Sequence, residues 1–338
     1  MNIKCFGTLR DGREVSVITL AAGALSARVL TLGAILQDLR LQGTAWPLVL
    51  GAPQLGAYEG PMAWFGAVVG PMANRIGGAC ATIDGTRLRF EANDGANTLH
   101  GGASGTSTQL WQVRDLAEDR VTLGLQLPAG LGGFPGNRDI TAQYRIIAPA
   151  TLSLRLTAGT DAPTLMNLAH HPYWNLDGST DVRAHWLRVA AARYLPTDAA
   201  CLPLGPPRRL AGAPHDLRVA RRLDGLPPLD HNYCLSNSNR RLTPVAELTG
   251  ASGLRLRLAT TAPGLQVYDG AGIDTAPWPG LRGKPYGAHA GLALEPQLWP
   301  DAAGRAGSPG VLLSPEENWG QHSTYTFSHG ADAAVKEG

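Results

Sequence analysis

Hydrophobic positions alternate with polar or small ones in several runs of the chain. Residues 121–127, 152–156 and 254–258 each carry Val or Leu at every second position, with Thr, Gly, Gln, Ser or Arg between them. Successive side chains of a β-strand point to opposite faces of the sheet, so this period of two predicts strands with one face on a core and one in water. Turn dipeptides separate such runs, namely DG at 11–12, 84–85 and 177–178 and PG at 135–136 and 263–264.

Helical periodicity is scarce. Residues 49–60 have room for one short helical turn, and residues 196–229, rich in Pro, Arg and Gly, predict a long irregular excursion with short strands. Closely spaced antiparallel strands with Gly and Pro turns predict an all-β protein, a large antiparallel β-sandwich or a barrel. The chain shows no internal repeat and no linker, so residues 1–330 are expected to form a single domain and residues 331–338 a flexible tail.

The composition agrees with a large β-domain. Gly and Pro supply 42 and 25 of the 338 residues, together about a fifth, where average usage is roughly an eighth. Such a chain has many turns and few long helices. Because 44% of its residues are hydrophobic and only 17% are charged, it can bury a large core.

Charge and cysteine content exclude several classes of protein. A formal net charge of +2, with dispersed basic residues, argues against nucleic-acid binding. The four cysteines form no C-x-x-C pair, which indicates neither a zinc site nor a redox motif and favours reduced thiols. The N-terminal residues show no apolar stretch of a signal peptide, and no run approaches the roughly 20 apolar residues of a membrane span. We therefore expect a cytoplasmic protein without a metal and without a membrane partner.

Polar residues interrupt apolar or glycine-rich stretches at widely separated positions. Taken singly, a loop histidine such as His100 or a turn residue such as Asp230 is more often structural. If folding gathers them, carboxylates, two imidazoles, a guanidinium and amides line one pocket, which suits proton transfer on an uncharged, polyhydroxylated substrate such as a sugar. The residues are Asn74, Arg75, His100, His171, Asp230, Gln266 and Glu295.

The segment 167–178, NLAHHPYWNLDG, carries two adjacent histidines. On a strand, His170 and His171 face opposite ways and cannot both ligate one metal. His171 shares the more polar face with Tyr173, so it is the better candidate for a pocket. Tyr173 either stacks on a sugar ring or packs in the core. Pro172 indicates a strand edge or a bulge, which would change the direction of the neighbouring side chains.

Glu295 lies on an apolar strand predicted over residues 291–299. By the same parity it shares a face with small residues, where a ligand has room. A carboxylate in such a strand is either catalytic or part of an ion pair. The candidate partner is Arg75, the one charged residue in the stretch 61–82.

Seven motifs follow one another through the chain. They are ANRI, TLHGG, GFPGN, the H-x-Y-W-N-L of 171–176, LDHNY, GLQVYDG and LEPQLWPDA. In this order they resemble the aldose 1-epimerase (galactose mutarotase) family over nearly the whole chain. The resemblance implies that family's supersandwich, an elaborate antiparallel β-sandwich, which agrees with the period of two. The chain departs from the family at His170, where Asn is frequent, at Pro296, where Thr is frequent, and at residues 71–72 before ANRI; these departures concern substrate preference more than chemistry.

The resemblance also implies roles for individual residues. By motif position, Glu295 would be the general base, His171 the general acid, and His100 a helper near the ring oxygen and C1. The family needs no metal and no cofactor. The residues expected to bind the sugar's hydroxyl groups or to stack on its ring are Asn74, Arg75, Asp230, Gln266 and Tyr173.

The implied activity is interconversion of the α and β anomers of a free monosaccharide such as galactose or glucose, by a monomer or homodimer. Two alternatives share the fold. A hexose-6-phosphate 1-epimerase would need a basic cluster for the phosphate, which the Arg pairs 208–209 and 221–222 could supply, and a sugar-binding protein would need no catalysis. A glycoside hydrolase would need two carboxylates flanking one bond, for which Glu295 and Asp230 are the candidates.

Overall fold

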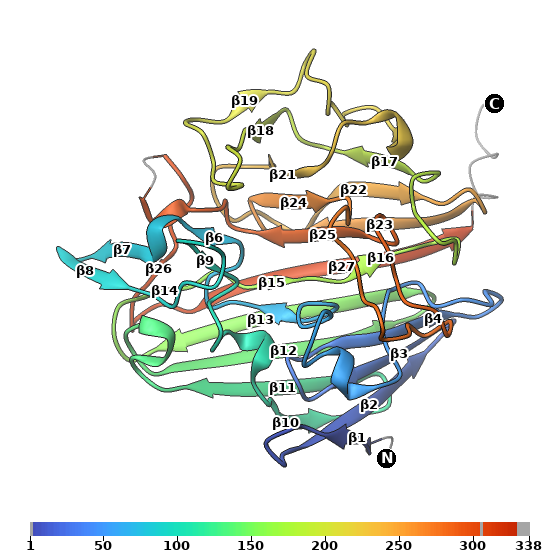
Figure 1. Cartoon of the computed structure of the whole chain (residues 1–338), viewed down its shortest axis with the longest axis horizontal. Coiled ribbons are helices and arrows are strands. Elements are labelled where there is room, and N and C mark those ends of the chain that lie inside the picture. Colours follow the sequence, from blue (N-terminus) through green and yellow to red (C-terminus); the bar gives the residue numbers. More distant parts are fainter. Residues whose placement is uncertain (1–2, 305–306, 330–338) are drawn as a thin grey trace.

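A nine-stranded antiparallel sheet runs through the molecule (Figure 1), in a computed structural model that describes residues 3–304 and 307–329. The three runs with a period of two lie in its strands β11, β13 and β23, so the strand prediction is confirmed. The last strand, β27, pairs with both β13 and β23 and thereby joins the two halves of the sheet. In order, the strands are β10 (Gln112–Leu116), β11 (Arg120–Leu127), β12 (Arg138–Ile147), β13 (Thr151–Thr160), β27 (Trp319–His329), β23 (Leu254–Thr260), β22 (Thr243–Thr249), β17 (Trp186–Val189) and β20 (Arg221–Arg222).

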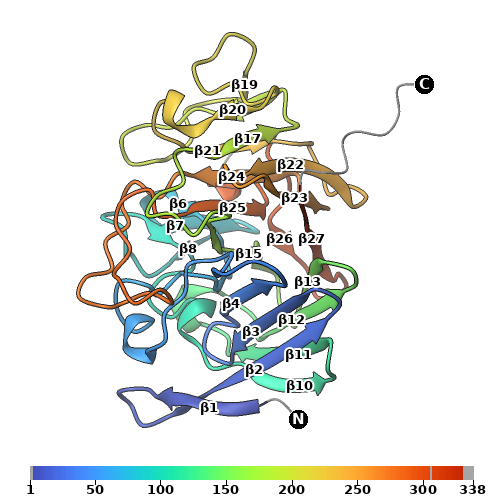
Figure 2. The same cartoon turned by 90° about the vertical axis from the view of Figure 1, so that its right-hand side faces the viewer.

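Two further sheets pack against this sheet, one on each half (Figures 1 and 2). Their inner faces contribute to one large hydrophobic core together with the long strands β11 to β13 and β23. The four-stranded sheet has the order β1 (Ile3–Thr8), β2 (Glu14–Ala22), β3 (Leu25–Leu30) and β4 (Leu36–Leu41). The six-stranded sheet has the order β16 (Tyr173–Trp174), β25 (Leu292–Gln297), β24 (Gly264–Tyr268), β21 (Asp230–Cys234), β18 (Arg193–Leu195) and β19 (Arg208–Arg209).

Short ladders and helical turns fill the connections. The ladders are β5 (Val68–Val69) with β15 (Ala169–His170), β6 (Arg75–Ile76) with β9 (Thr98–Leu99), β7 (Cys80–Ile83) with β8 (Thr86–Arg89), and β14 (Thr164–Leu165) with β26 (Leu312–Leu313). In the described residues the helical segments are 3-10 turns: η1 (Leu55–Ala57), η2 (Gly77–Ala79), η3 (Thr106–Thr108), η4 (Leu131–Gly133), η5 (Leu223–Gly225) and η6 (Ala302–Gly304).

These short elements agree with the sequence. The turn expected within residues 49–60 is η1, and residues 196–229 form the irregular excursion, with only β19, β20 and η5 in it. None of the helices in the described part of the chain is long and apolar enough to cross a membrane. No disulfide joins any two of the four cysteines. The single domain over residues 1–330 stays a prediction, and the tail 331–338 lies outside the described residues.

Aromatic packing holds the six-stranded sheet against the nine-stranded one. Trp174 of β16 is fully buried, and its ring centroid lies 4.9 Å from that of Tyr325 and 5.8 Å from that of Phe327, both in β27. Tilted aromatic pairs of this kind add about 0.5–1.5 kcal/mol beyond the burial of their area. The contact fixes β16, and with it the paired strand β25, against the nine-stranded sheet.

Candidate active site

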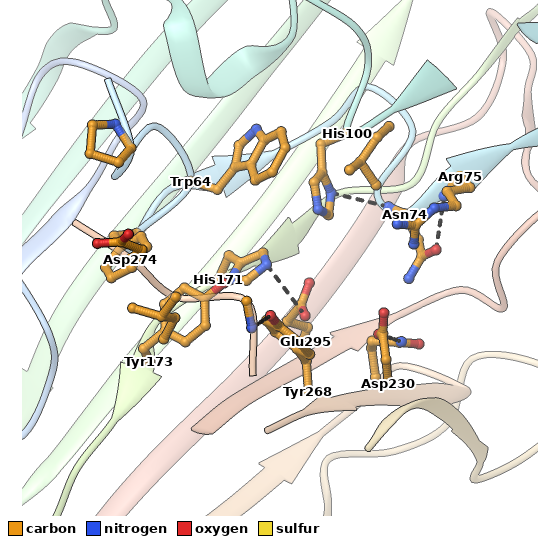
Figure 3. A pocket seen from close by; sticks show the side chains of 16 residues that line it. Trp64, Asn74, Arg75, His100, His171, Tyr173, Asp230, Tyr268, Asp274 and Glu295 are labelled. Atoms are coloured by element: carbon orange, nitrogen blue, oxygen red, sulfur yellow. Dashed lines mark hydrogen bonds and ion pairs between the residues drawn. The ribbon is translucent and has the colours of Figure 1, made fainter. Parts of the chain in front are cut away.

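All eight residues expected to act on the sugar line one cavity of about 260 Å³ (Figure 3). Five of them lie in five different strands and three in the connections between strands, so the fold gathers them from distant parts of the sequence. Gln266 and Glu295 lie in the middle of β24 and β25 of the six-stranded sheet, and Asn74 and His100 come from the segments beside the β6–β9 ladder. The eight residues are Asn74, Arg75, His100, His171, Tyr173, Asp230, Gln266 and Glu295.

The register of the six-stranded sheet sets the polar floor of the pocket. Gln266 of β24 stands opposite Glu295 of β25, and Asp230 of β21 stands opposite Tyr268 of β24. The Gln266 amide donates a hydrogen bond of 2.5 Å to the Asp230 carboxylate. A slip of one residue would turn each of these side chains to the other face of the sheet, so the register itself is required for the site.

The two adjacent histidines separate as their parity predicted. His171 lines the pocket, whereas His170 of β15 points into the core, where Tyr144 and Tyr325 pack against its ring at centroid distances of 5.6 and 5.8 Å. The Nδ1 atom of His170 lies 3.3 Å from the Tyr325 hydroxyl. His170 is therefore a buried structural histidine, and only His171 can reach a ligand.

Glu295 and His171 form the central pair of the pocket. The Nε2 atom of His171 lies 3.5 Å from Oε1 of Glu295, and both side chains are almost completely buried. Burial raises the pKa of Glu295 well above its ordinary value, with a further increase from Asp230, and Arg75 opposes the shift. Burial also lowers the pKa of His171, to about 4. Both shifts disfavour the charged forms.

These shifts make Glu295 a stronger base and His171 a stronger acid than the same groups in water. An exposed Glu and His at pH 7 would form a carboxylate and a partly protonated imidazole. A pair that shares one proton can therefore act with a carboxylate on Glu295 as the base and with the proton on His171 as the acid. A sugar that gives a proton to Glu295 while it takes one from His171 leaves the net charge of the pair unchanged.

Arg75 pairs with a residue that the sequence did not point out. Its Nε atom lies 2.7 Å from Oδ2 of Asp94, so the ion pair expected as an alternative, Arg75 with Glu295, is replaced by this one. Asn74 contributes to the same corner, because its side-chain oxygen accepts the backbone N–H of Arg75 at 2.9 Å. Asp94 precedes a glycine, and a D-G pair by itself indicates only a turn.

The opposite end of the pocket is aromatic. Tyr173 lies between Phe65 and Tyr268, at centroid distances of 4.4 and 6.2 Å, and Trp64 packs against His100 at 5.1 Å. Packing in the core is confirmed for Tyr173, which belongs to a hydrophobic cluster, and because it also lines the cavity, stacking on a sugar ring stays a prediction. Parity could have identified Tyr268, two residues after Gln266 on the same face. The sequence carries no comparable signal for the other lining residues that it missed: Pro61, Trp64, Phe65, Leu99, Gly272, Ile273 and Asp274.

The charge of the pocket favours a neutral ligand. Among the described lining residues Arg75 is the one permanent cation, and Asp94 already neutralises it. Asp230 is half-buried and has no ion-pair partner among the described residues, and burial raises its pKa. The Arg pairs 208–209 and 221–222 form β19 and β20 and do not line the cavity, so they supply no phosphate site there.

Comparisons with known protein sequences all find members of one family. A sequence model of the family described as aldose 1-epimerase matches residues 16–326. The galactose mutarotase of Rattus norvegicus is 33% identical over 335 residues, which cover 96% of this chain and 97% of the relative. The aldose 1-epimerase of Escherichia coli (strain K12) is 31% identical over 338 residues, covering 94% of this chain and 96% of the relative.

Solved structures share the architecture. The structure of a GalM/aldose epimerase homologue from C. elegans has a TM-score of 0.87 and 29% identity, covering 93% of this chain and 99% of that chain. The structure of galactose 1-epimerase from Lactobacillus acidophilus NCFM has a TM-score of 0.84 and 26% identity, covering 97% of this chain and 98% of that chain. The architecture of this chain therefore agrees with the family that the sequence comparisons find.

Proposed function

This chain belongs to the aldose 1-epimerase family and is an isomerase, and we propose that it interconverts the α and β anomers of free aldoses through Glu295 and His171. The observation that carries the proposal is the buried carboxylate–imidazole pair, 3.5 Å apart, in a cavity lined by hydrogen-bonding groups. Anomer exchange needs one group that accepts a proton and one that donates it, and this pair supplies both.

The reaction consists of two proton transfers and one bond rotation. Glu295 accepts the proton of the C1 hydroxyl while His171 delivers a proton to the ring oxygen, so the bond between C1 and the ring oxygen breaks and an aldehyde forms at C1. Rotation about the C1–C2 bond exposes the other face of the aldehyde. The ring oxygen then attacks that face, Glu295 returns its proton to the former carbonyl oxygen, and His171 takes back its own.

The other lining residues bind and orient the sugar. Asn74, Arg75, Asp230 and Gln266 offer amide, guanidinium and carboxylate groups to its hydroxyls, and Tyr173 offers a ring to its C–H face. The ion pair with Asp94 fixes the position of the Arg75 guanidinium. Near the ring oxygen, the guanidinium would stabilise the negative charge that develops as the ring opens.

The substrate is a neutral aldose, with galactose and glucose as the first candidates because relatives carry galactose in their names. A hexose 6-phosphate is disfavoured, since a phosphate group would meet Asp230, Glu295 and Asp274 with a single, already paired arginine. The four cysteines without a disulfide support a cytoplasmic location. A monomer or homodimer without nucleic-acid partners remains our proposal for its assembly.

Polarimetry tests the proposal directly. Freshly dissolved α-D-galactose and α-D-glucose should approach their equilibrium rotation faster with the protein than without it, and glucose 6-phosphate should follow the spontaneous rate. Acceleration of glucose 6-phosphate alone would identify the phosphate-specific alternative. Binding of free sugars without any acceleration would leave a sugar-binding protein on this fold.

The pH profile is expected to extend further into acid than an exposed histidine would allow. The competent pair holds one proton, and a second proton enters on His171, whose pKa burial lowers to about 4. As pH falls, kcat/KM should therefore decline with a midpoint near pH 4, where an unperturbed imidazole would give a midpoint of about 6.5. On the alkaline side, activity should be lost as pH rises through the raised pKa of Glu295, because the pair then gives up its only proton.

The fold must be followed at each pH, because buried neutral histidines lose stability in acid. Burial lowers the pKa of His170 to about 3 and that of His171 to about 4. Below pH ~6.5 the unfolded chain consequently binds more protons than the folded chain, and stability falls as pH drops toward these values. Circular dichroism at each pH separates loss of activity from loss of fold. A midpoint near 6.5 in a fully folded protein would contradict the assignment of this pair.

A further inference from the structure

Two hydrogen bonds link His100 to Asn74 on the wall of the pocket. The backbone N–H of His100 donates to the backbone oxygen of Asn74 at 3.0 Å, and the backbone N–H of Asn74 donates to Nδ1 of the His100 ring at 3.2 Å. The β6–β9 ladder aligns the two segments, because Arg75 pairs with Leu99. Both residues have left-handed backbones, with φ of 62° for Asn74 and 53° for His100, a conformation that Asn and His adopt more often than most other non-glycine residues.

The second of these bonds determines where the imidazole carries its proton. A neutral imidazole has one N–H and one acceptor nitrogen, and here Nδ1 is the acceptor. The proton must then sit on Nε2. If Nδ1 were protonated, in the other tautomer or in the imidazolium, two N–H groups would face each other at 3.2 Å. Burial acts in the same direction, since it lowers the pKa of His100 well below its ordinary value, as do His171 and Arg75.

Packing fixes the direction in which the ring points. The rings of Trp64 and His171 meet it edge-on, at centroid distances of 5.1 and 5.3 Å. In Figure 3 the imidazole extends into the pocket above His171 and Glu295, with one of its nitrogens on the dashed line to Asn74. The other nitrogen, Nε2, remains for a ligand.

We propose that the backbone amide of Asn74 holds His100 in one neutral tautomer, so that its Nε2–H is a permanent hydrogen-bond donor to an oxygen of the bound sugar. His100 then differs in role from His171, although both are buried pocket histidines. His171 exchanges a proton with the substrate, whereas His100 has no acceptor nitrogen left and contributes a fixed dipole. Asn74 is the positioning residue. The proposal rests on the proposed function only for the identity of the oxygen that receives the bond.

The same bond bears on metal binding. His100, His171 and Glu295 offer ligand atoms that all lie within 4.8 Å of one another, a two-histidine, one-carboxylate set that suits divalent transition metals. A histidine that binds a metal through Nε2 must give up the proton there and carry it on Nδ1, where it would oppose the Asn74 N–H. The tautomer of His100 therefore leaves the cluster with two available ligands and favours proton transfer over metal binding.

The tautomer can be read directly by nitrogen NMR. Protein labelled with ¹⁵N-histidine is recorded in long-range ¹H–¹⁵N spectra without sugar between pH 8 and 5, and H100Q assigns the His100 signals by their loss. We expect an unprotonated Nδ1 and a protonated Nε2, both unchanged over this range, and also unchanged with one equivalent of ZnCl₂. Averaged nitrogen shifts, titration of His100 in this range, or a zinc-induced shift of its Nε2 would overturn the proposal. Because no substrate is present, this result stands apart from that of polarimetry.

A pair of amide variants tests the consequence for catalysis. The terminal NH₂ of Gln in H100Q can reach the position of Nε2–H, whereas Asn in H100N can accept the Asn74 N–H but offers no donor at that position. Loss of one such donor costs about 10²–10³ in kcat. We expect H100N to lose activity on this scale and H100Q to retain at least about tenfold more, with the acid limb of the pH profile unmoved in both. Equal losses in the two variants, or a displaced acid limb in H100Q, would show that His100 itself carries a proton in the reaction.

Discussion

Replacing Glu295 with Gln is expected to lower kcat by about 10²–10⁴-fold, because a general base contributes on this scale and an amide cannot accept the proton. Gln keeps the length and shape of Glu, and the neighbouring strands leave the residue buried on the pocket floor. KM should change much less than kcat, because the other lining residues bind most of the hydroxyl groups of the sugar. Polarimetry over a range of sugar concentrations separates kcat from KM. Near-normal turnover would exclude Glu295 as the base.

The same substitution is expected to stabilise the fold at neutral pH. Burial raises the folded-state pKa of Glu295 above its ordinary 4.5, so the folded chain resists ionisation that the unfolded chain undergoes freely. Stability of the wild type therefore falls as pH rises from about 4.5 toward the raised pKa, and the Gln variant is free of this loss. In thermal unfolding, E295Q should melt with the wild type in acid and above it at pH 7. A melting temperature of E295Q below that of the wild type at pH 7 would contradict a carboxyl group whose ionised form is disfavoured by burial.

The histidine pair 170–171, at the end of β15 and just after it, provides a matched comparison. We expect H171N to lose about 10²–10⁴-fold in kcat, because the acid and its 3.5 Å contact with Glu295 disappear. The same substitution one residue earlier, H170N, should leave kcat within a few-fold of the wild type. It should instead lower the melting temperature, because the ring that packs between Tyr144 and Tyr325 is lost.

Activity and unfolding measured on both variants test this division of roles. Similar activity losses in H170N and H171N would mean that the core histidine takes part in the reaction, through Tyr325 or through the position of β15. A stable, active H171N would remove the imidazole from the mechanism. Circular dichroism at the assay temperature shows whether either variant has unfolded.

Much of the architecture follows from local pattern. Alternation over residues 121–127, 152–156 and 254–258 predicted strands that the structure places in one sheet, because a period of two matches the geometry of a strand with one buried face. The same parity separated His171 from His170 correctly. It also placed Glu295 on the pocket side of β25.

Other features depend on contacts between distant segments. In the sequence Asp94 is only a turn residue, and the fold brings it beside Arg75, next to the β6–β9 ladder. The sequence alone therefore could not decide whether Arg75 pairs with Glu295 or with another carboxylate. The aromatic wall at Trp64 and Phe65 lies in a connection without periodicity, where no pattern distinguishes pocket from surface.

The sequence by itself determined the strands with a period of two, the family and the eight residues that meet in the pocket, because side-chain alternation and motif order are local properties. Only the tertiary structure decided the state of those residues. A pKa depends on how completely water is excluded, and a tautomer depends on which distant group supplies a hydrogen bond. The shifted pKa values of Glu295 and His171 and the fixed proton of His100 all arise from segments that approach one another only in the folded chain.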